Sequence, residues 1–481
     1  MNEDELIAPE KERWLIFTVM LGSFLSVLNA TNINIALPSF MQYYQVDINT
    51  VQWLVVGYML ATGLVMPTIG YFSDRYSGRN LFALGLGILA ATSLGCALAP
   101  NIQALIIARI GQGIAGGILM PVPMTLVYQF IPRERQLMAV SLISMVSSVG
   151  IAMGPTLSGV LITYFGWQAI FYINIPFAII DIWLLIKVVP VKILSAQQRL
   201  DVVGLVTSFI GTAGILIGFN QGSTLGWTSP LVVGTITVST LALGYFIWHE
   251  VKIHAPMLNF AVFKYSRYTY SFLLNGSTSI ATCLSPMFMS LFLQEVLMED
   301  ALHAGLAMLI PSLLMGVMAP VAAKLTDRFG RRIVIFGGML ILLGATWELS
   351  HFSLATTIAG ITLWLSLRYI GLGLIIPLIN NFAMASVPMR LTSHASAMLS
   401  WSRQLISTLS ISIFSVIYSS SMLRYAKEGL GAALAADQGR LIKCTAINDV
   451  NLYSLILLII CVPLIYFMND KVGAAAEDNA K

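Results

Sequence analysis

The chain has 481 residues, 57% of them hydrophobic and only 10% charged, and its mean hydropathy is +0.83. Soluble domains carry roughly a quarter charged residues, so this composition excludes an ordinary soluble domain and indicates a chain solvated mainly by lipid. The net charge of +4 does not indicate a nucleic-acid-binding protein, because the basic residues are scattered over short loops and form no basic patch with interleaved aromatic residues.

Apolar segments long enough to cross a bilayer recur along the chain, separated by short polar turns. A helix needs about 20 apolar residues to cross the hydrocarbon core. The predicted transmembrane helices lie near residues 14–38, 51–72, 80–99, 102–130, 138–163, 167–187, 202–220, 231–248, 269–294, 303–325, 333–350, 355–385, 394–419 and 450–468. We therefore expect an all-α integral membrane protein with about fourteen such helices.

The basic residues predict how these helices are oriented. Lys and Arg occur in alternate loops, and the loops between them, near 39–50, 100–101, 164–166 and 221–230, carry none. By the positive-inside rule, both termini lie in the cytoplasm. The segment 420–449 breaks the pattern with four basic residues and is predicted to be the longest external loop.

A short pattern repeats after the second and the tenth predicted helices. The first copy reads GYFSDRYSGRN and the second reads AKLTDRFGRR, so that Asp74-Arg75 and Asp327-Arg328 stand at matching places. Each Asp follows a small residue by four positions, Gly70 in the first copy, and small residues let helices approach closely. We expect these carboxylates to accept hydrogen bonds from a neighbouring helix end.

Arg109, in the fourth predicted helix, is the strongest single candidate for a functional residue. A cation near the bilayer centre costs roughly 2.5–3.5 kcal/mol on insertion scales and usually faces a cavity or a partner. Gln112, Gly116 and Met120 share its helix face, so that Gln112 and Met120 are candidate substrate contacts. The alternative is an arginine that only bonds to backbone carbonyls. The overlapping G-x-G-x-x-G pattern is not a dinucleotide site, because it lacks a preceding strand.

A second buried arginine beside a Gly-x-Gly supports internal duplication. The segment ARIGQGIAGG, residues 108–117, is matched by LRYIGLGL, residues 367–374, in the twelfth predicted helix. Duplicated halves with the binding site between them are typical of secondary transporters.

The fifth predicted helix combines glycines with a proline. Gly150 and Gly154 are four residues apart and share a face on which another helix can pack closely. Pro155 removes one helical hydrogen bond and is expected to bend the helix, and Gly159 follows one turn later. Ordinary helix packing is the alternative to a functional role for these residues.

Several further polar residues lie in predicted helices. Each alone suits a packing hydrogen bond as well as a ligand contact. They are Asn275 and Gln294 in helix nine, Arg368, Asn380 and Asn381 in helix twelve, and Arg403 and Gln404 in helix thirteen. Asp181 and Glu348 are acids inside helices six and eleven, which we interpret as structural more readily than as proton carriers.

Taken together, these motifs resemble the major facilitator superfamily, and specifically its fourteen-helix drug:proton antiporter branch (EmrB/QacA-type multidrug exporters). The segments that carry the resemblance include VQWLVVGYML with Tyr58, both Asp-Arg turns, RIGQGIAGG, GIAMGPTLSG, WQAIFYINIPF, HAGLAMLIP and SWSRQLIS. The resemblance implies two pseudo-symmetric six-helix bundles, 1–187 and 266–481, with a linker and two inserted helices in 188–265.

The resemblance also implies roles and a location. Arg109 would take part in proton coupling, the glycine-proline motif of helix five would shape the interface that rocks during alternating access, and Tyr58 and Arg403 would face the substrate cavity. The expected location is a bacterial inner membrane, with the lipid bilayer, protons and a small amphipathic substrate as partners. A periplasmic adaptor protein is a further partner expectation, and the proton gradient takes the place of a cofactor.

One position departs from the family pattern. The first helix of relatives reads roughly Leu-Asp-x-Thr-x-x-Asn, whereas this chain has Asn29 where the Asp stands, and an amide does not titrate near neutral pH. Asn34 matches the family's asparagine and is expected to brace the helix. Asn29 and Asn32 are three residues apart and are predicted to offer hydrogen bonds to the cavity where relatives offer a charge.

Two functions therefore stay open. The first is export of hydrophobic or amphipathic drugs by proton antiport, with coupling through another carboxyl (Asp74, Asp181, Glu295 or Glu348). The second is a dedicated carrier of one metabolite or lipid, uncoupled or coupled through a non-standard site. A membrane enzyme is not expected, because the sequence shows no Ser/His/Asp set, metal cluster or phosphate loop.

Overall fold

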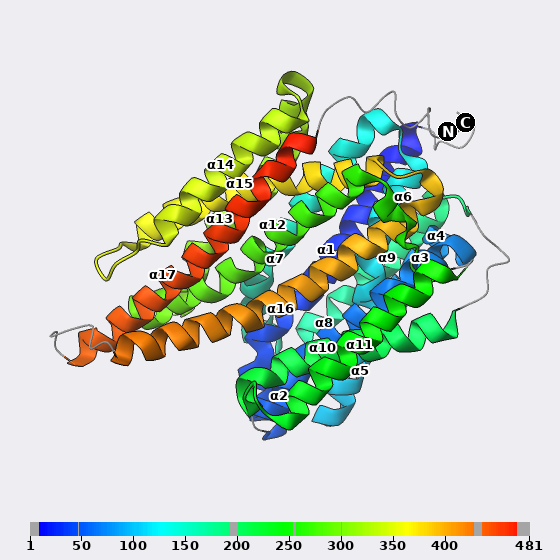
Figure 1. The fold of residues 1–481 in the computed structure, drawn as a ribbon. Helices are drawn as coiled ribbons and strands as arrows, with labels where there is room; N and C mark the ends of the chain where they lie inside the picture. The colour runs from blue at the N-terminus through cyan, green and yellow to red at the C-terminus, as the bar shows by residue number, and fades with distance from the viewer. Residues whose placement is uncertain are drawn as a thin grey trace. The chain divides into compact units, whose positions relative to one another are not determined.

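Long helices make up nearly all of the computed structural model, which describes residues 9–46, 48–192, 201–253, 256–299, 301–427 and 435–468 (Figure 1). These ranges contain no β-strand, so the predicted all-α class is confirmed. The chain divides into two units of mutually contacting residues. Unit 1 comprises Met1–Leu216, Thr235–Tyr265 and Met384–Ser402, and unit 2 comprises Ile217–Gly234, Ser266–Ala383 and Arg403–Lys481. The predicted division at residues 187 and 265 stays a prediction.

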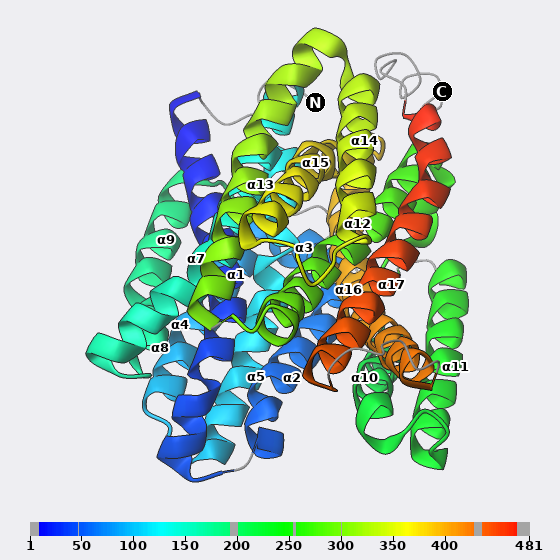
Figure 2. The ribbon, with the colours of Figure 1, turned by 90° about the vertical axis from the view of Figure 1, so that its left-hand side faces the viewer.

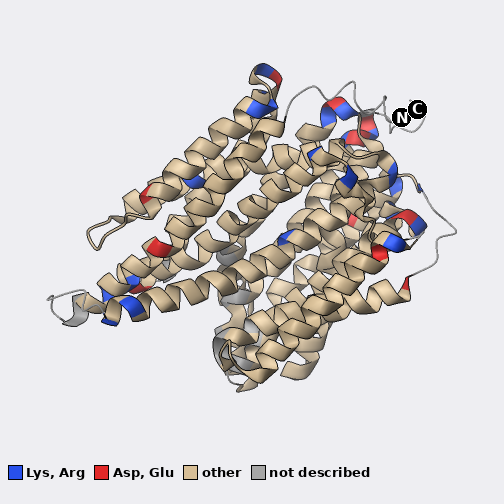
Figure 3. Cartoon of the chain, in the orientation of Figure 1, with Lys and Arg blue, Asp and Glu red and all other residues tan. Residues whose placement is uncertain are grey.

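Thirteen helices in the described residues are long and apolar enough to cross a membrane. Each coincides with one of the predicted segments, and the remaining one, 138–163, lies inside the 33-residue helix α7. Charged side chains gather toward the helix ends and are sparse along their lengths (Figure 3), as the cost of charge in hydrocarbon requires.

Unit 1 is built mainly from the first half of the chain. Its helices are α1 (Pro9–Tyr44), α2 (Ile48–Val65), α3 (Ile69–Tyr76), α4 (Gly78–Ala97), α5 (Ile102–Leu119), α6 (Val122–Phe130), α7 (Arg133–Phe165), α8 (Ala169–Tyr172) and α9 (Asn174–Val188). It also includes most of α10 (Val202–Leu225) and α11 (Pro230–Lys252), the 3-10 turn Phe260–Lys264, and the first turns of α16 (Thr392–Lys427).

Prolines divide two of the expected helices. The segment predicted as 51–72 runs through α2, a 3-10 turn at Met66–Thr68 and α3, because Pro67 has no N–H for the helical ladder. Pro121 follows the end of α5 in the same way. Within the unit, α1 packs against α7 and α9, and α2 packs against α5 (Figures 1 and 2).

Aromatic packing closes one end of unit 1. Phe40, near the end of α1, meets Trp167 edge-on with ring centroids 5.2 Å apart, and Phe171 on α8 lies against both. All three rings are buried. This end of α1 is therefore anchored to α8 by contacts that burial and aromatic geometry both favour.

Unit 2 contains α12 (Ser266–Leu291), a π-helical turn at Phe292–Val296, α13 (Ala301–Phe329), α14 (Arg331–Leu349), α15 (Ile358–Ala385), the remainder of α16 and α17 (Ala435–Cys461), followed by a 3-10 turn at Val462–Phe467. Within it, α17 packs against α14 and α12, and α13 against α14.

The expectation of a long loop over 420–449 is wrong. The helix α16 continues to Lys427, and α17 begins at Ala435. Polar contacts hold the early part of α17: Arg440 Nε donates to the Val296 carbonyl (2.7 Å) and Lys443 Nζ pairs with Glu295 (2.8 Å). Hydropathy misses this polar helical extension because it is stabilised by tertiary contacts.

Candidate functional site

Arg109 is the centre of a polar network inside unit 1. Its side chain is completely buried on α5. Its Nε donates to the Leu54 carbonyl on α2 (3.2 Å), and Nη1 donates to Gln112 Oε1 (2.8 Å). The same Nη1 donates to Asn29 on α1, 3.3 Å from Oδ1 and 3.4 Å from the backbone carbonyl. One guanidinium thus joins α1, α2 and α5.

Tyr58 completes the surroundings of the guanidinium. The Arg109 guanidinium lies over the Tyr58 ring, with Cζ 4.6 Å from the ring centroid, which is a cation–π distance. Glycines on α5 make room for it. A Cβ on Gly113 would collide with the Tyr58 carbonyl, and a Cβ on Gly116 would lie 3.1 Å from Tyr58 Cζ. Of the two glycines in the Gly-x-Gly pattern, Gly113 therefore allows close packing of α2 on α5, whereas Gly111 faces α4.

The network continues through Gln112 to two further helices. Gln112 Nε2 donates to Ser93 Oγ on α4 (2.8 Å), and Asn174 Nδ2 on α9 donates to the same oxygen (3.3 Å). Sequence reasoning missed Ser93, since a lone serine in an apolar helix usually bonds only its own backbone. Among the described residues, every oxygen that accepts from Arg109 is neutral.

Asn29 and Asn32 face different helices. Asn29 contacts Arg109, whereas Asn32, with its amide turned to match its neighbours, donates to Ser158 Oγ (2.8 Å) and to the Gly154 carbonyl (3.2 Å) on α7. Each side chain is only 3% exposed. Their spacing predicts one shared face, but the two side chains contact different helices, Asn29 reaching α5 and Asn32 reaching α7. The side chain of Asn34 lies outside the described residues.

The first Asp-Arg turn is packed against the start of α16. Asp74 is buried, and its Oδ2 lies 3.3 Å from His394 Nε2. A Cβ on Gly70 would collide with the same imidazole, which explains the glycine. Arg75 Nη1 donates to the hydroxyl of Tyr71 (2.8 Å). Asp74 therefore meets a neighbouring helix end, as expected, although the partner His394 was not anticipated.

The second Asp-Arg turn keeps the backbone but not the burial. Ser77 and Gly330 each stand three residues after the Asp, and both have positive φ, 75° and 80°. The left-handed conformation explains the glycine in the second copy. Asp327, however, is exposed. The two copies share a turn geometry and differ in what surrounds the carboxylate.

The glycines of α7 pack against α1 at two of three positions. A Cβ on Gly150 would lie 3.2 Å from Val27, and one on Gly154 would collide with Thr31. A Cβ on Gly159 would meet nothing within 4 Å. The helix runs without interruption through Pro155, whose side chain lies outside the described residues.

Unit 2 contains a second buried arginine at the matching place. Arg368 on α15 is completely buried; Nη1 donates to Asn451 Oδ1 on α17 (3.3 Å) and Nη2 donates to the Ala281 carbonyl on α12 (3.2 Å). Glycines again allow close packing, since a Cβ on Gly371 would lie 2.7 Å from the Gly338 carbonyl on α14. The repeat expected from sequence thus has a structural counterpart.

The other predicted cavity residues differ in burial. Asn275 and Asn380 are buried in α12 and α15, each with one amide atom that has no hydrogen-bond partner among the described residues. Gln294 is exposed and donates to Ser290 Oγ (2.8 Å), Met120 is half-buried at the end of α5, and Arg403 is exposed on α16. The role of these five residues stays a prediction.

The four candidate coupling carboxyls differ in environment. Asp74 faces His394, Glu295 pairs with Lys443, and Glu348 is half-buried. Asp181 on α9 is completely buried, and neither carboxyl oxygen has a hydrogen-bond partner among the described residues. The nearest basic side chain along α9, Lys187, points elsewhere: its Nζ lies over the Trp183 ring, 3.7 Å from the ring centroid.

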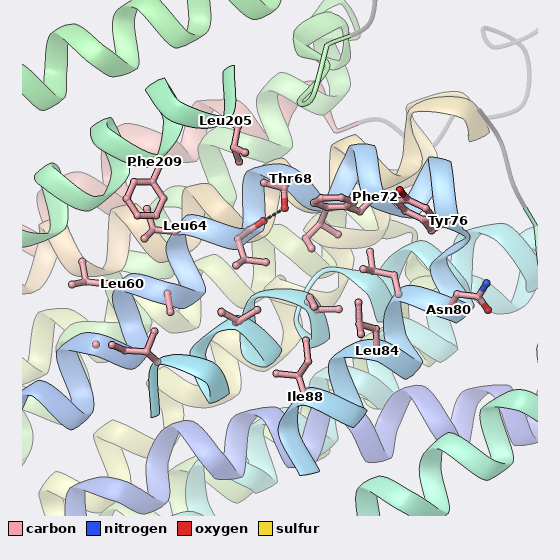
Figure 4. A pocket seen from close by; sticks show the side chains of 18 of the residues that line it. Leu60, Leu64, Thr68, Phe72, Tyr76, Asn80, Leu84, Ile88, Leu205 and Phe209 are labelled. Atoms are coloured by element: carbon pink, nitrogen blue, oxygen red, sulfur yellow. Dashed lines mark hydrogen bonds between the residues drawn. The ribbon is translucent and has the colours of Figure 1, made fainter. Parts of the chain in front are cut away.

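An apolar cavity of about 890 Å³ lies in unit 1 between α2 to α5 and α10. Leu60, Leu64 and Phe72 point into it from one side, Leu84 and Ile88 from α4, and Leu205 and Phe209 from α10 (Figure 4). Its lining is almost wholly hydrocarbon, with Tyr76 and Asn80 at one end. Sequence reasoning did not find this cavity, because the apolar residues that line it have the same pattern as ordinary lipid-facing positions.

Comparison with known proteins agrees with this architecture. The family model for the Major Facilitator Superfamily matches residues 19–411. The uncharacterized MFS-type transporter YhcA of Bacillus subtilis is 30% identical over 404 residues, covering 84% of this chain and 76% of its own. The lincomycin resistance protein LmrB of Listeria monocytogenes is 25% identical, with 87% of this chain and 88% of its own covered. The putative multidrug resistance protein MdtD of Yersinia pestis is 28% identical, with 84% and 87% covered.

Solved structures show the same fold at low sequence identity. The human organic anion transporter MFSD10 aligns with a TM-score of 0.64 at 15% identity, covering 94% of this chain and 100% of that chain. The proton:xylose symporter XylE aligns with a TM-score of 0.59 at 14% identity, covering 94% and 96%. With its helices, its duplicated Asp-Arg turns and this match over most of its length, the chain belongs to the major facilitator superfamily of membrane transporters.

Proposed function

We propose that this transporter exports hydrophobic or amphipathic compounds from a bacterial cytoplasm across the inner membrane in exchange for protons. In this proposal both termini are cytoplasmic, as the distribution of Lys and Arg predicts. The named activities of LmrB and MdtD, lincomycin resistance and putative multidrug resistance, support the substrate class. Recruitment of a periplasmic adaptor stays a prediction from the resemblance.

The observation that carries the proposal is the burial of Arg109. A guanidinium inside a membrane bundle is expensive, and such groups usually mark a functional site. Here three helices and the Tyr58 ring hold it in place. Because its contacts cross between α1, α2 and α5, a shift of any of these helices changes its hydrogen bonds. Arg109 is therefore well placed to couple helix movement to the charge state of a nearby group.

The carboxyl we assign to proton binding is Asp181. It is buried without a hydrogen-bond partner among the described residues, and a neutral acid is far less costly there than a carboxylate. The Asp181 carboxyl faces α1 at Gly22, where a Cβ added to the glycine would lie 3.0 Å from Oδ2. Asn174, the last member of the Arg109 network, precedes it by seven residues on the same face of α9.

Reconstituted transport tests this proposal. Purified protein is placed in liposomes, a pH gradient is imposed, and the movement of a fluorescent lipophilic cation is followed. Gradient-driven transport should be abolished in Arg109→Ala and in Asp181→Asn. Arg135→Ala is the matched control, because Arg135 is an exposed arginine paired with Glu12 (2.9 Å), and it should transport normally.

A dedicated carrier of one metabolite or lipid is the second candidate, and Asn29 favours it. With an amide in place of the usual acid, this position of the first helix has no group that titrates near neutral pH. In its uncoupled form, this function predicts transport that is equally fast without a gradient and unchanged in Asp181→Asn. That result would refute proton antiport and leave the fold and the Arg109 network as they are.

A further inference from the structure

Two buried carboxyls converge where the inserted helices begin and end. Asp201 directly precedes α10, and Glu250 lies in the last turn of α11. They are 7% and 2% exposed. A Cβ on Gly204 would collide with Asp201 Oδ2 and with Glu250 Oε1 alike, so both oxygens stand over this glycine. Glu250 Oε1 has no hydrogen-bond partner among the described residues.

Within the described ranges, one side chain that can carry a positive charge contacts this carboxyl pair. His249 Nε2 lies 3.1 Å from Asp201 Oδ1 and 3.0 Å from Oδ2. Lys252, the nearest basic side chain along α11, points elsewhere, with Nζ 4.1 Å from the centroid of the Trp248 ring. Even a protonated His249 compensates only one of two negative charges. Full ionisation of the pair is strongly disfavoured, because two buried negative charges would then lie in contact. A single proton between the two carboxyls removes one charge and allows a hydrogen bond from one carboxyl to the other.

The pair also holds the segment 256–265, which follows α11 and which we call the connector. Glu250 Oε2 accepts a hydrogen bond from the Leu258 amide (3.1 Å). The next amide, that of Asn259, donates to His394 Nδ1 (3.2 Å), and His394 Nε2 faces Asp74 (3.3 Å). Leu258 is completely buried. Two consecutive connector amides are therefore held by two titratable side chains.

Among the described residues, contacts link the connector to titratable groups on four helices. Asp201 belongs to the start of α10, His249 and Glu250 to α11, Asp74 to α3 and His394 to α16. Because Nδ1 of His394 accepts from Asn259, its Nε2 carries the proton directed at Asp74.

We propose that Asp201 and Glu250 share one proton and, with His249, form a proton-binding site that closes the ends of α10 and α11 over the connector. Loss of the proton leaves two facing carboxylates whose repulsion separates the helix ends and loosens the connector. The contact is therefore intact at lower pH and is lost as the pH rises through the titration of the pair. This site lies outside the Arg109 network and does not depend on which compound is carried.

Infrared spectroscopy and hydrogen exchange on the full-length protein in detergent test the site without any substrate. The wild-type protein should show the carbonyl band of a protonated carboxylic acid that disappears as the pH is raised. Glu250→Gln, whose amide can donate to Asp201 and accept from Leu258, should lack this band. In the same variant, amide exchange in 256–265 should no longer accelerate with rising pH beyond its intrinsic dependence. Asp201→Asn is the second variant and should also abolish the pH step.

Two matched controls separate this site from other carboxyls. Glu348→Gln, on the half-buried Glu348 of α14, should keep both the band and the pH-dependent exchange. Asp181→Asn should lose transport and its own contribution to the carbonyl band, but keep the pH-dependent exchange of the connector and the part of the band that Glu250→Gln removes. If Glu250→Gln and Asp201→Asn retain the wild-type pH step in exchange, or if no band is lost in either, the shared proton is refuted. That result would leave proton antiport through Asp181 standing.

Discussion

Replacing Asn29 by aspartate puts a carboxylate where the amide oxygen now lies, 3.3 Å from Arg109 Nη1. At this separation and an effective dielectric constant of about 20, two unit charges attract by about 5 kcal/mol. Burial opposes the attraction, because removing a carboxylate from water costs several kcal/mol in a protein interior. The two contributions are of similar size. The balance between the protonated and ionised forms of the introduced carboxyl should therefore stay near that of an exposed aspartate for as long as the contact with Arg109 lasts.

The substitution should make transport more strongly pH-dependent than in the wild-type protein, because position 29 then gains or loses a charge as the pH changes. The assay is the initial rate of dye transport in proteoliposomes, measured over a series of pH values at a fixed gradient. Thermal unfolding provides a second measurement. In a double-mutant cycle of Asn29→Asp with Arg109→Gln, the coupling energy should fall within about 0.5–3 kcal/mol, as for residues in one ion-pair network.

Two results would contradict this reasoning. An unchanged pH profile in Asn29→Asp would place position 29 outside the coupling route. A coupling energy near zero would show that the carboxylate turns away from Arg109. Asn32→Asp serves as a control on the same helix, because Asn32 contacts α7 rather than the guanidinium; it should show no coupling to Arg109.

Two further predictions concern packing and an interfacial hydrogen bond. Gly113→Ala should destabilise the protein by about 1–3 kcal/mol through overpacking, because the added Cβ would collide with the Tyr58 carbonyl. Thermal unfolding measures the change. The control is Gly159→Ala, whose Cβ would enter open space, and it should be neutral or stabilising. Tyr44→Phe should cost about 0.5–1.5 kcal/mol by removing the hydrogen bond from the Tyr44 hydroxyl to the Ala99 carbonyl (2.9 Å). Because burial raises the pKa of Tyr44 from 10.0 to about 12, this difference should be constant below pH 10 and shrink as the pH rises toward 12; a difference that vanishes already at neutral pH would refute it.

Much of this architecture follows from one-dimensional patterns. Hydropathy locates every span, because lipid forces each crossing segment to be long, apolar and helical. The Gly-x-Gly beside Arg109 and beside Arg368 predicts close helix packing, since only a missing Cβ lets another backbone approach there. Such features depend on local composition and spacing. They are readable without knowledge of which helices are neighbours.

The partners of polar residues could not be read in this way. Asn29 and Asn32 share a face by spacing, yet they contact α5 and α7, because a side chain between two neighbouring helices reaches either one. The contact of Asp74 with His394 lies beside the hydrogen bond between Ser73 and Ser393, and both join residues 320 positions apart along the chain. The carboxyl pair at Asp201 and Glu250 depends on how α10 and α11 meet over Gly204.

The absence of an acid at position 29 changes what the Arg109 network can do. Among the described residues its members are one arginine, three amides, a serine and a tyrosine, of which none but the arginine carries a charge at neutral pH. The network therefore keeps a charge of +1 across the physiological pH range and cannot itself exchange a proton for a substrate. A proton bound at Asp181 on α9 and released as a helix moves would change the net charge of unit 1 while this cation stays fixed. In the proposed antiport, Arg109 therefore supplies a constant field, and the Asp181 carboxyl on another helix is the titrating group.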